Sequence, residues 1–334
     1  MFFWLFLKKS MAVIQSYQHA FLTYLEAQLP TSSPANLYAP ARYILQLGGK
    51  RIRPVLALMA ADAVSGNFQQ ALPAALAVEI FHNFSLVHDD IMDEAPLRRG
   101  KPTVHQAWDV NTGILSGDVL LVLAYECFNT YPPDLFCLLT QLFSKTAREV
   151  CEGQQYDMDF PLQASVSQAE YLQMIEYKTA VLLGCSLQMG AMVGGMSSEH
   201  AKPFYDFGIQ LGLAFQLQDD YLDAFGDPQT FGKQLGGDII ENKKTLLYLL
   251  ALEQGTSQQQ LQLKEWFSQS PKDTSHKIKA VKELFIATNA DKAIQKMIES
   301  YTKKALGLVN EFSIPPAKKE LFTGFASQLM DRTL

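Results

Sequence analysis

Residues 74–93 read AALAVEIFHNFSLVHDDIMD, a long apolar run without glycine or proline that ends in three aspartates. Such a run predicts a helix. Helical spacing puts Asp89 and Asp93 on one face, with Asp90 beside them. Carboxylates this close repel one another, and a divalent cation with oxygen ligands relieves the repulsion. A basic segment, residues 96–102 (PLRRGKP), follows at once. The stretch therefore predicts a helix whose end binds an anion through metal.

The acidic pattern occurs twice. Residues 215–223 read FQLQDDYLD, which repeats the D-D-x-x-D spacing at the end of another apolar run, and Gly226, Gly232 and Lys233 follow. Either motif alone fits a solvated helix end equally well. Two such motifs on two apolar helices, each followed by cations, favour a binding site.

The rest of the chain is divided into helical segments by glycine and proline. No stretch shows sustained period-two alternation, so we expect an all-α fold, one large bundle of ten or more helices without a linker. A short helix with Pro40 in its first turn is expected to end at residue 47, and residues 226–242 are expected to form a long loop. The other expected helices are 12–29, 55–64, 72–93, 103–109, 118–130, 135–155, 167–190, 202–225, 244–253, 258–268, 275–287, 290–308 and 316–330.

We expect residues 11–334 to form a single domain. Residues 1–10 (MFFWLFLKKS) are an apolar extension that need not belong to the fold, and their first seven residues are too short to span a bilayer. Three interpretations stay open for this extension: a segment upstream of a true start at Met11, a membrane-surface contact, or an apolar segment packed on a partner.

Composition excludes several classes of protein. The formal net charge of −6 over 334 residues argues against a general binder of nucleic acid or anionic membranes. Four cysteines without CxxC spacing predict buried thiols in a reducing cytosol and no zinc site. No segment predicts stable membrane insertion, so we expect a cytoplasmic protein.

Six motifs in a fixed order resemble the trans-isoprenyl diphosphate synthase (polyprenyl synthetase) family, over about residues 40 to 250. They are residues 48–54 (GGKRIRP), 88–93 (HDDIMD) with 98–100 (RRG), 178–179 (KT), Gln216 with 219–223 (DDYLD), 232–233 (GK), and Lys243. Asn242 departs from the glycine that many relatives have there.

The resemblance implies the isoprenoid synthase fold, with a central substrate cavity, in a homodimer. It implies head-to-tail condensation of isopentenyl diphosphate with an allylic diphosphate (dimethylallyl, geranyl or farnesyl). The allylic diphosphate ionises to a cation, the isopentenyl double bond attacks, and the departing diphosphate takes the proton. The implied cofactor is Mg²⁺, two or three ions per active site bridged by diphosphate, acting as a Lewis acid and a template.

The resemblance also assigns roles to residues. The metal ligands would be Asp89, Asp93 and Asp219, supported by the other aspartates of the two motifs, Asp90, Asp220 and Asp223. The allylic diphosphate would be clamped by Arg98, Lys178, Lys233 and Lys243. The isopentenyl diphosphate would lie in a basic pocket of Lys50, Arg53 and Arg99 with His82 nearby. Thr179 and Gln216 would steady the allylic cation by their dipoles.

Three of these assignments keep an alternative. His82 could equally be an ordinary buried histidine. Lys243 and Lys244 are adjacent, so the sequence leaves open which one reaches the site. Arg332 could close over the diphosphate or belong to a frayed tail.

Product length depends on the helix before the first acidic motif. Phe84 lies five residues before Asp89, about 8 Å along the axis, and Phe81 lies nearly one turn further. Ser85, next to Phe84, is small. In the family, an aromatic at the fifth position alone is compatible with a C20 product, whereas aromatics at the fourth and fifth tend to give C15. We therefore expect geranylgeranyl diphosphate ahead of farnesyl diphosphate.

Three other functions fit the sequence less well. A longer-chain synthase is disfavoured by Phe81 and Phe84. A class I terpene cyclase would need no second diphosphate pocket, so residues 48–54 argue against it. An inactive subunit of a heteromeric synthase would have lost acidic-motif residues, which this chain keeps.

Overall fold

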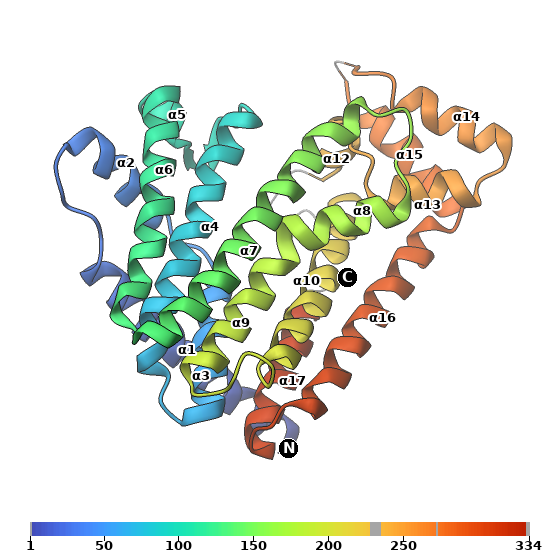
Figure 1. Cartoon of the computed structure of the whole chain (residues 1–334). Coiled ribbons are helices and arrows are strands. Elements are labelled where there is room, and N and C mark those ends of the chain that lie inside the picture. The colour runs from blue at the N-terminus through green and yellow to red at the C-terminus, as the bar shows by residue number, and fades with distance from the viewer. Residues whose placement is uncertain (1, 228–234, 272, 332–334) are drawn as a thin grey trace. The chain divides into compact units, whose positions relative to one another are not determined.

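A computed structural model describes residues 2–227, 235–271 and 273–331, with side chains from residue 12 onward. Helices make up nearly all of it, which confirms the predicted all-α class (Figure 1). The strands among these residues, β1 (Leu97–Arg98) and β2 (Lys101–Pro102), form one short antiparallel hairpin. The chain divides into two compact units. Unit 1 comprises Met1–Ala147, Cys185–Tyr205 and Ser313–Lys318, and unit 2 comprises Arg148–Gly184, Asp206–Phe312 and Lys319–Leu334.

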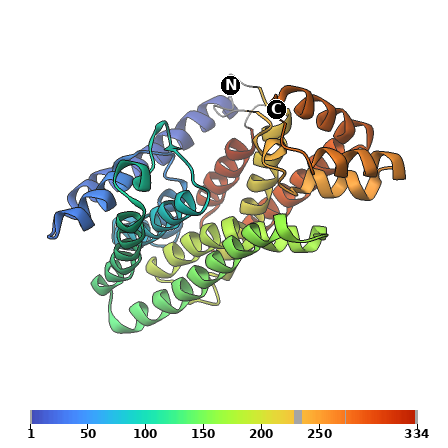
Figure 2. The same ribbon diagram turned by 90° about the horizontal axis from the view of Figure 1, so that it is seen from above.

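Unit 1 is built around α4 (Leu72–Met92). This helix is apolar on nearly every side, as expected for a core helix, and it packs against α1, α2, α3 and α6 (Figures 1 and 2). The other helices that lie wholly in unit 1 are α1 (Phe2–Ala27), α2 (Ala35–Gln46), α3 (Ile52–Ser65), η1 (Phe68–Ala71), α5 (Val104–Ala107), α6 (Val110–Glu126) and η2 (Cys127–Thr130).

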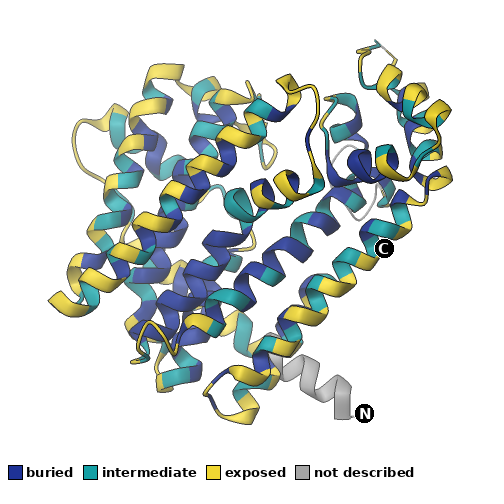
Figure 3. Ribbon diagram, turned by 45° about the vertical axis from the view of Figure 1, so that its right-hand side comes forward, coloured by how far each residue is buried: buried dark blue, intermediate teal, exposed yellow. Residues whose placement is uncertain are grey.

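Unit 2 has a second core, in which the rings of Phe207, Phe312 and Phe322 pack edge to face with centroids 5.2–5.9 Å apart. Buried residues are dark blue in Figure 3. The helices that lie wholly in unit 2 are η3 (Phe160–Leu162), α8 (Gln168–Ile175), η4 (Glu176–Ala180, a π-helix), α12 (Gly237–Ile240), α13 (Leu246–Gln254), α14 (Ser257–Trp266), α15 (Ser275–Ala287), α16 (Ala290–Leu308) and η5 (Val309–Glu311). The unit boundaries fall inside α7 (Pro133–Asp159), α9 (Val181–Val193), α10 (Lys202–Phe225) and α17 (Pro316–Met330).

Most predicted helices are confirmed to within a few residues, but several details are wrong. The helix expected at 12–29 begins at Phe2, so the expected extension of residues 1–10 is continuous with it in its described part. The helix expected at 118–130 begins at Val110, since Gly113 and Gly117 are accommodated inside it. Pro40 lies inside α2 rather than in its first turn. The helix expected at 167–190 is interrupted by η4. The basic loop after α4 forms the β1–β2 hairpin, and the loop expected at 226–242 contains α12 in its described part.

Two expectations from composition also need correction. Cys185 is buried, but Cys137 and Cys151 are exposed, so the expectation of buried thiols fails for these two. Among the described residues one stretch, Val110–Thr130, is long and apolar enough to cross a membrane, and 28% of its most apolar window is buried. The core helix of a soluble protein can be equally long and apolar, so this stretch alone is weak evidence for a membrane span.

Candidate active site

The first acidic motif ends α4, where the helix dipole disfavours negative charge. Its three aspartates have different environments. Asp90 is 1% exposed, and Arg98 donates to it from Nε at 3.1 Å and from Nη2 at 2.5 Å. Asp89 is half-buried, and Asp93 is exposed at the C-cap. The protein itself thus neutralises the middle aspartate, while the outer two stay accessible on one face of the helix.

The β1–β2 hairpin explains how Arg98 reaches Asp90. Its two-residue turn is formed by Arg99 at φ 53° and Gly100 at φ 75°, as a tight hairpin with positive φ at both positions requires. The turn sends Arg98 back toward α4, and the guanidinium of Arg99 donates to the carbonyl of Gly48. The hairpin therefore connects the acidic motif to the loop before α3.

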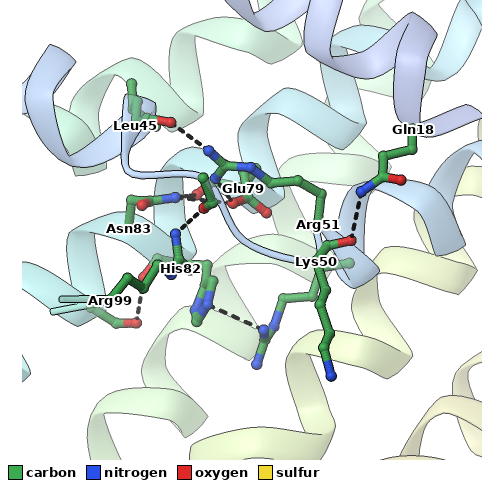
Figure 4. Close-up of polar contacts among 11 residues, drawn as sticks. Gln18, Leu45, Lys50, Arg51, Glu79, His82, Asn83 and Arg99 are labelled. Carbon is green, nitrogen blue, oxygen red and sulfur yellow. Dashed lines mark hydrogen bonds and ion pairs between the residues drawn. The ribbon is translucent and has the colours of Figure 1, made fainter. Parts of the chain in front are cut away.

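That loop, residues 48–51, carries the basic motif in a left-handed backbone. Gly48, Gly49 and Arg51 have φ values of 82°, 119° and 50°. The φ of Gly49 is one that residues with a Cβ rarely adopt, and a Cβ there would lie 2.8 Å from the Arg99 guanidinium, so this position favours glycine. Lys50 is exposed, and its carbonyl accepts from Gln18 at 3.4 Å (Figure 4).

A buried ion pair beneath the loop was missed from the sequence. Arg51 is 5% exposed and Glu79 2% exposed, and the Arg51 guanidinium donates to Glu79 and to the carbonyl of Leu45 (Figure 4). Asn83 Nδ2 also donates to Glu79 Oε1, at 3.1 Å. Glu79 lies in an otherwise apolar stretch of α4, and that isolated charge was the signal that could have revealed the pair.

His82 and Arg53 lie beside this pair. Arg53 Nη1 is 3.3 Å from His82 Nε2, and because arginine only donates, this nitrogen of His82 accepts. Burial, reinforced by the positive charges of Arg53 and Arg99, holds the pKa of His82 well below its usual value. Burial also lowers the pKa of Arg53 to about 10. A neutral histidine and charged arginines therefore face one another, in surroundings rich in hydrogen-bond donors for anions.

The second acidic motif ends α10 in unit 2, and its middle aspartate is again buried. Asp220 is 5% exposed and accepts from Tyr171 Oη at 2.5 Å and from Gln216 Nε2 at 3.2 Å. Burial, with the charge of Asp238, raises its pKa. Asp219 and Asp223 are half-buried. The two motifs thus share one design, in which the middle aspartate is tied to the protein.

The carboxylate of Asp223 forms hydrogen bonds with the start of α12, which follows the second acidic motif. This carboxylate accepts from the backbone N–H groups of Gly237 at 3.2 Å and Asp238 at 3.1 Å. Lys243, just beyond α12, has Nζ 2.9 Å from Glu241 Oε2 and 3.9 Å from Asp238 Oδ1. This arrangement gathers three carboxylates and a lysine within unit 2.

The choice between the adjacent lysines follows from their contacts. Lys244 donates to main-chain carbonyls in η3 and just after it, including that of Phe160 at 3.1 Å. Lys243 faces the acidic side chains of the α12 segment instead. Lys243 is therefore the lysine that lies with the acidic motif.

The Lys-Thr motif lies in η4, where the helix widens to π geometry, a feature common at functional sites. Lys178 Nζ donates to Asp157 Oδ2 at 2.5 Å, and Thr179 Oγ1 donates to Gln216 Oε1 at 3.2 Å. A Cβ on Gly153 would collide with the backbone of Lys178, so α7 and η4 touch there. Asp157, on α7, is a site neighbour that sequence reasoning missed.

The predicted chain-length residues are packed in an aromatic cluster of unit 1. Phe84 is 9% exposed and Phe81 0% exposed, with ring centroids 5.4 Å apart. Phe84 also packs on His88 at 4.8 Å, and Phe81 packs on Phe143 at 5.3 Å. Ser85 Oγ donates to the carbonyl of His82 at 2.9 Å.

Unit 1 contains all the predicted pocket and first-motif residues: Lys50, Arg53, His82, Asp89, Asp90, Asp93, Arg98 and Arg99. Unit 2 contains Lys178, Thr179, Gln216, Asp219, Asp220, Asp223 and Lys243. Lys233 and Arg332 lie outside the described residues. Among those described, no three His, Cys, Asp or Glu side chains form a ready-made metal site.

Comparisons with known proteins agree with these motifs. The model of the polyprenyl synthetase family matches residues 34–284. The chain belongs to this family. A geranylgeranyl diphosphate synthase of Methanosarcina mazei is 42% identical over 235 residues, which cover 69% of this chain and 72% of that protein. This polyprenyl synthetase is therefore a short-chain prenyltransferase.

Solved structures of the family have the same fold. The crystal structure of a geranylgeranyl pyrophosphate synthase is 52% identical, with a TM-score of 0.92 over 95% of this chain and 98% of that chain. A geranylgeranyl pyrophosphate synthase from Corynebacterium glutamicum is 26% identical, with a TM-score of 0.83 over 96% of this chain and 98% of that chain. That protein was solved with isoprenyl diphosphate and magnesium.

Proposed function

We propose that this prenyltransferase condenses isopentenyl diphosphate with allylic diphosphates, head to tail, to give geranylgeranyl diphosphate. The observation that carries the proposal is that unit 1 contains an acidic motif and a separate cluster of basic side chains, Lys50, Arg53 and Arg99. One end of α4 offers accessible carboxylates to a metal-bound diphosphate. The loop before α3 and the first turn of α3 offer Lys50 and Arg53 to a second diphosphate without metal.

We propose that residues 11–334 act as a single domain, in which Asp89, Asp93 and Asp219 hold Mg²⁺, two or three ions bridged by the allylic diphosphate. Carboxylate oxygens suit this hard cation, which takes few protein ligands and the rest from phosphate and water. When bound, the metal supplies Lewis-acid stabilisation of the leaving diphosphate.

The middle aspartates act differently in this proposal. Asp90 fixes the orientation of Arg98, which donates to it from two nitrogens. Asp220 is held by Tyr171 and Gln216, and Gln216 in turn accepts from Thr179. Both aspartates therefore orient neighbours that face the allylic diphosphate or the cation formed from it.

The chain's cations clamp the two diphosphates. Lys178 and Lys243, with Lys233 and Arg98, bind the allylic diphosphate, and Asp157 keeps Lys178 extended through their 2.5 Å contact. The isopentenyl diphosphate binds to the ammonium of Lys50 and to Arg53 and Arg99, whose guanidinium groups match phosphate oxygens in pairs. Neutral His82 accepts from Arg53 and so orients it toward the ligand. The departing diphosphate then takes the proton released after attack.

The enzyme is proposed to act as a cytoplasmic homodimer. α6 carries exposed apolar side chains at Ile114, Leu115 and Val122, which are 42%, 58% and 55% exposed. A second copy of the same helix face would cover them from water. The variant pair Leu115→Glu and Val122→Glu should shift the elution of the protein from dimer to monomer, whereas Leu261→Glu on exposed α14 should not. An unchanged dimer would place the interface elsewhere.

One assay tests the reaction. Radiolabelled isopentenyl diphosphate is incubated with C5, C10 and C15 primers, with and without Mg²⁺, and products are separated by chain length. We expect Mg²⁺-dependent incorporation that stops at C20. A cyclic hydrocarbon formed from the C15 diphosphate without isopentenyl diphosphate would indicate a terpene cyclase instead. Products of C30 or more would indicate a long-chain synthase.

A further inference from the structure

A fully buried lysine lies on α15. Lys277 is 0% exposed, and its ammonium donates to Asn242 Oδ1 at 2.5 Å and to the carbonyl of Gln269 at 2.8 Å. It also lies 5.8 Å from the centre of the Phe267 ring. No carboxylate pairs with it within the described part of the chain. A buried cation is costly unless its hydrogen bonds are made, so the three contacts are what keep this lysine in the core.

The first of these partners, Asn242, has a strained backbone. Its φ is 59°, in the left-handed region that glycine adopts freely and asparagine tolerates. An asparagine side chain at a left-handed position can accept a hydrogen bond that holds the backbone in place. Glycine has no side chain that could accept one. Lys277 donates such a hydrogen bond.

Asn242 sets the direction of the next residue. The N–H of Lys243 donates to the carbonyl of Asp238 at 2.9 Å, and the carbonyl of Lys243 accepts from Thr245 at 2.9 Å. This turn directs Lys243 toward Glu241 and Asp238, while Lys244 is directed to main-chain carbonyls in and next to η3. A rotation at Asn242 would therefore move the Lys243 side chain away from the acidic segment.

We propose that Lys277 is a positioning residue: it holds Asn242 in the left-handed conformation that aims Lys243 at the allylic diphosphate. The inference rests on the clamp role proposed above for Lys243. Lys277 never touches substrate and acts through one amide side chain and one turn. Removing its ammonium should weaken the binding of one substrate and spare the other.

The test measures KM for each substrate separately in Lys277→Met, with Lys279→Met as the matched control on the exposed side of the same helix. Lys277→Met should raise KM for the allylic substrate about tenfold and change KM for isopentenyl diphosphate by less than about twofold. Lys279→Met should change neither. A purely structural role would lower the melting temperature and leave both KM values unchanged, which would overturn the proposal.

A double-mutant cycle with Asn242→Gly sharpens the test. Asn242→Gly removes the acceptor, so Lys277→Met in that background should cause no further rise in allylic KM. An equal rise in both backgrounds would show that Lys277 does not act through Asn242. The double variant removes both groups of the Lys277–Asn242 hydrogen bond, and the Gln269 carbonyl that also loses its donor belongs to an exposed residue, so this variant serves if Lys277→Met alone does not fold.

A separate variant, Lys243→Gln, distinguishes failure of the clamp from failure of the positioning. If Lys243→Gln leaves the allylic KM unchanged, the clamp is wrong and the role of Lys277 falls with it. If Lys243→Gln raises that KM and Lys277→Met does not, the clamp stands and only the positioning role is rejected.

Discussion

At the scale of single residues, buried charges distinguish residues that the sequence presents as equivalent. The GGKRIRP motif shows Lys50, Arg51 and Arg53 as three similar cations. In the structure Arg51 points inward to Glu79, Lys50 is exposed, and Arg53 contacts His82. The motif therefore combines one structural arginine with two candidate ligands, because the left-handed backbone at Arg51 turns its side chain into the core.

Glu79→Gln should destabilise the protein. It leaves Arg51 charged and buried without its counter-charge, which costs about 3–5 kcal/mol of the free energy of unfolding. Urea denaturation measures this cost. Glu283→Gln, on the exposed face of α15, is the control and should stay near wild type. The double variant Arg51→Met, Glu79→Leu should recover most of the loss. A Glu79→Gln protein as stable as wild type would mean that the pair contributes nothing.

His82 should make stability depend on pH. Burial and the nearby charges of Arg53, Arg99, Arg98 and Arg51 lower its pKa in the folded state. Above the unfolded pKa of about 6.5 both states are neutral and stability is complete. Below this pH His82 is protonated in the unfolded chain but stays neutral in the folded chain. The free energy of unfolding therefore falls by up to about 1.4 kcal/mol per pH unit.

Denaturation midpoints from pH 7.5 down to 5 would measure this slope. His82→Gln should flatten it, whereas His276→Gln, on an exposed position, should leave it unchanged. An identical slope in wild type and His82→Gln would mean that His82 is protonated in the folded protein.

At the scale of elements, α4 combines three roles along its length. Its middle packs against neighbouring helices, and its C-terminal end carries Asp89 and Asp93. Phe84 lies between the middle of the helix and this end. Gly117 of α6 allows this arrangement, because a Cβ there would collide with the ring of His88, which packs on Phe84. The apolar pattern predicted α4, and the contact with α4 explains why a glycine occurs inside α6.

Phe84→Ala should lengthen the product beyond C20, because it removes the ring expected to stop the growing chain. It should also cost about 3–5 kcal/mol of stability, as a buried phenylalanine truncation does. Chromatography of the radiolabelled products measures the first effect. Phe21→Ala, a buried phenylalanine of α1, is the control for the second: it should lose stability and keep the product length. An unchanged product length in Phe84→Ala would show that Phe84 does not stop the growing chain.

At the scale of the whole molecule, the mechanism requires both acidic motifs to act on one ligand. Asp89→Asn and Asp219→Asn should each lower kcat by roughly 100-fold or more, and the double variant should lose little beyond the worse single variant. Groups that act as a unit show this non-additivity. Chelation of divalent metal with EDTA should abolish turnover and leave the helical content unchanged. Fully multiplicative losses in the double variant would indicate two independent sites.

The sequence alone determined the all-α class, most helix positions and both acidic motifs, because these depend on local spacing and on glycine and proline breaks. Family membership followed from the order of the motifs. Only the tertiary structure decided which aspartates are buried, that Arg51 pairs with Glu79, that Lys243 rather than Lys244 lies with the acidic segment, and that Lys277 holds Asn242. These features depend on contacts between residues far apart along the chain, where burial and hydrogen-bond partners decide the state of each charge.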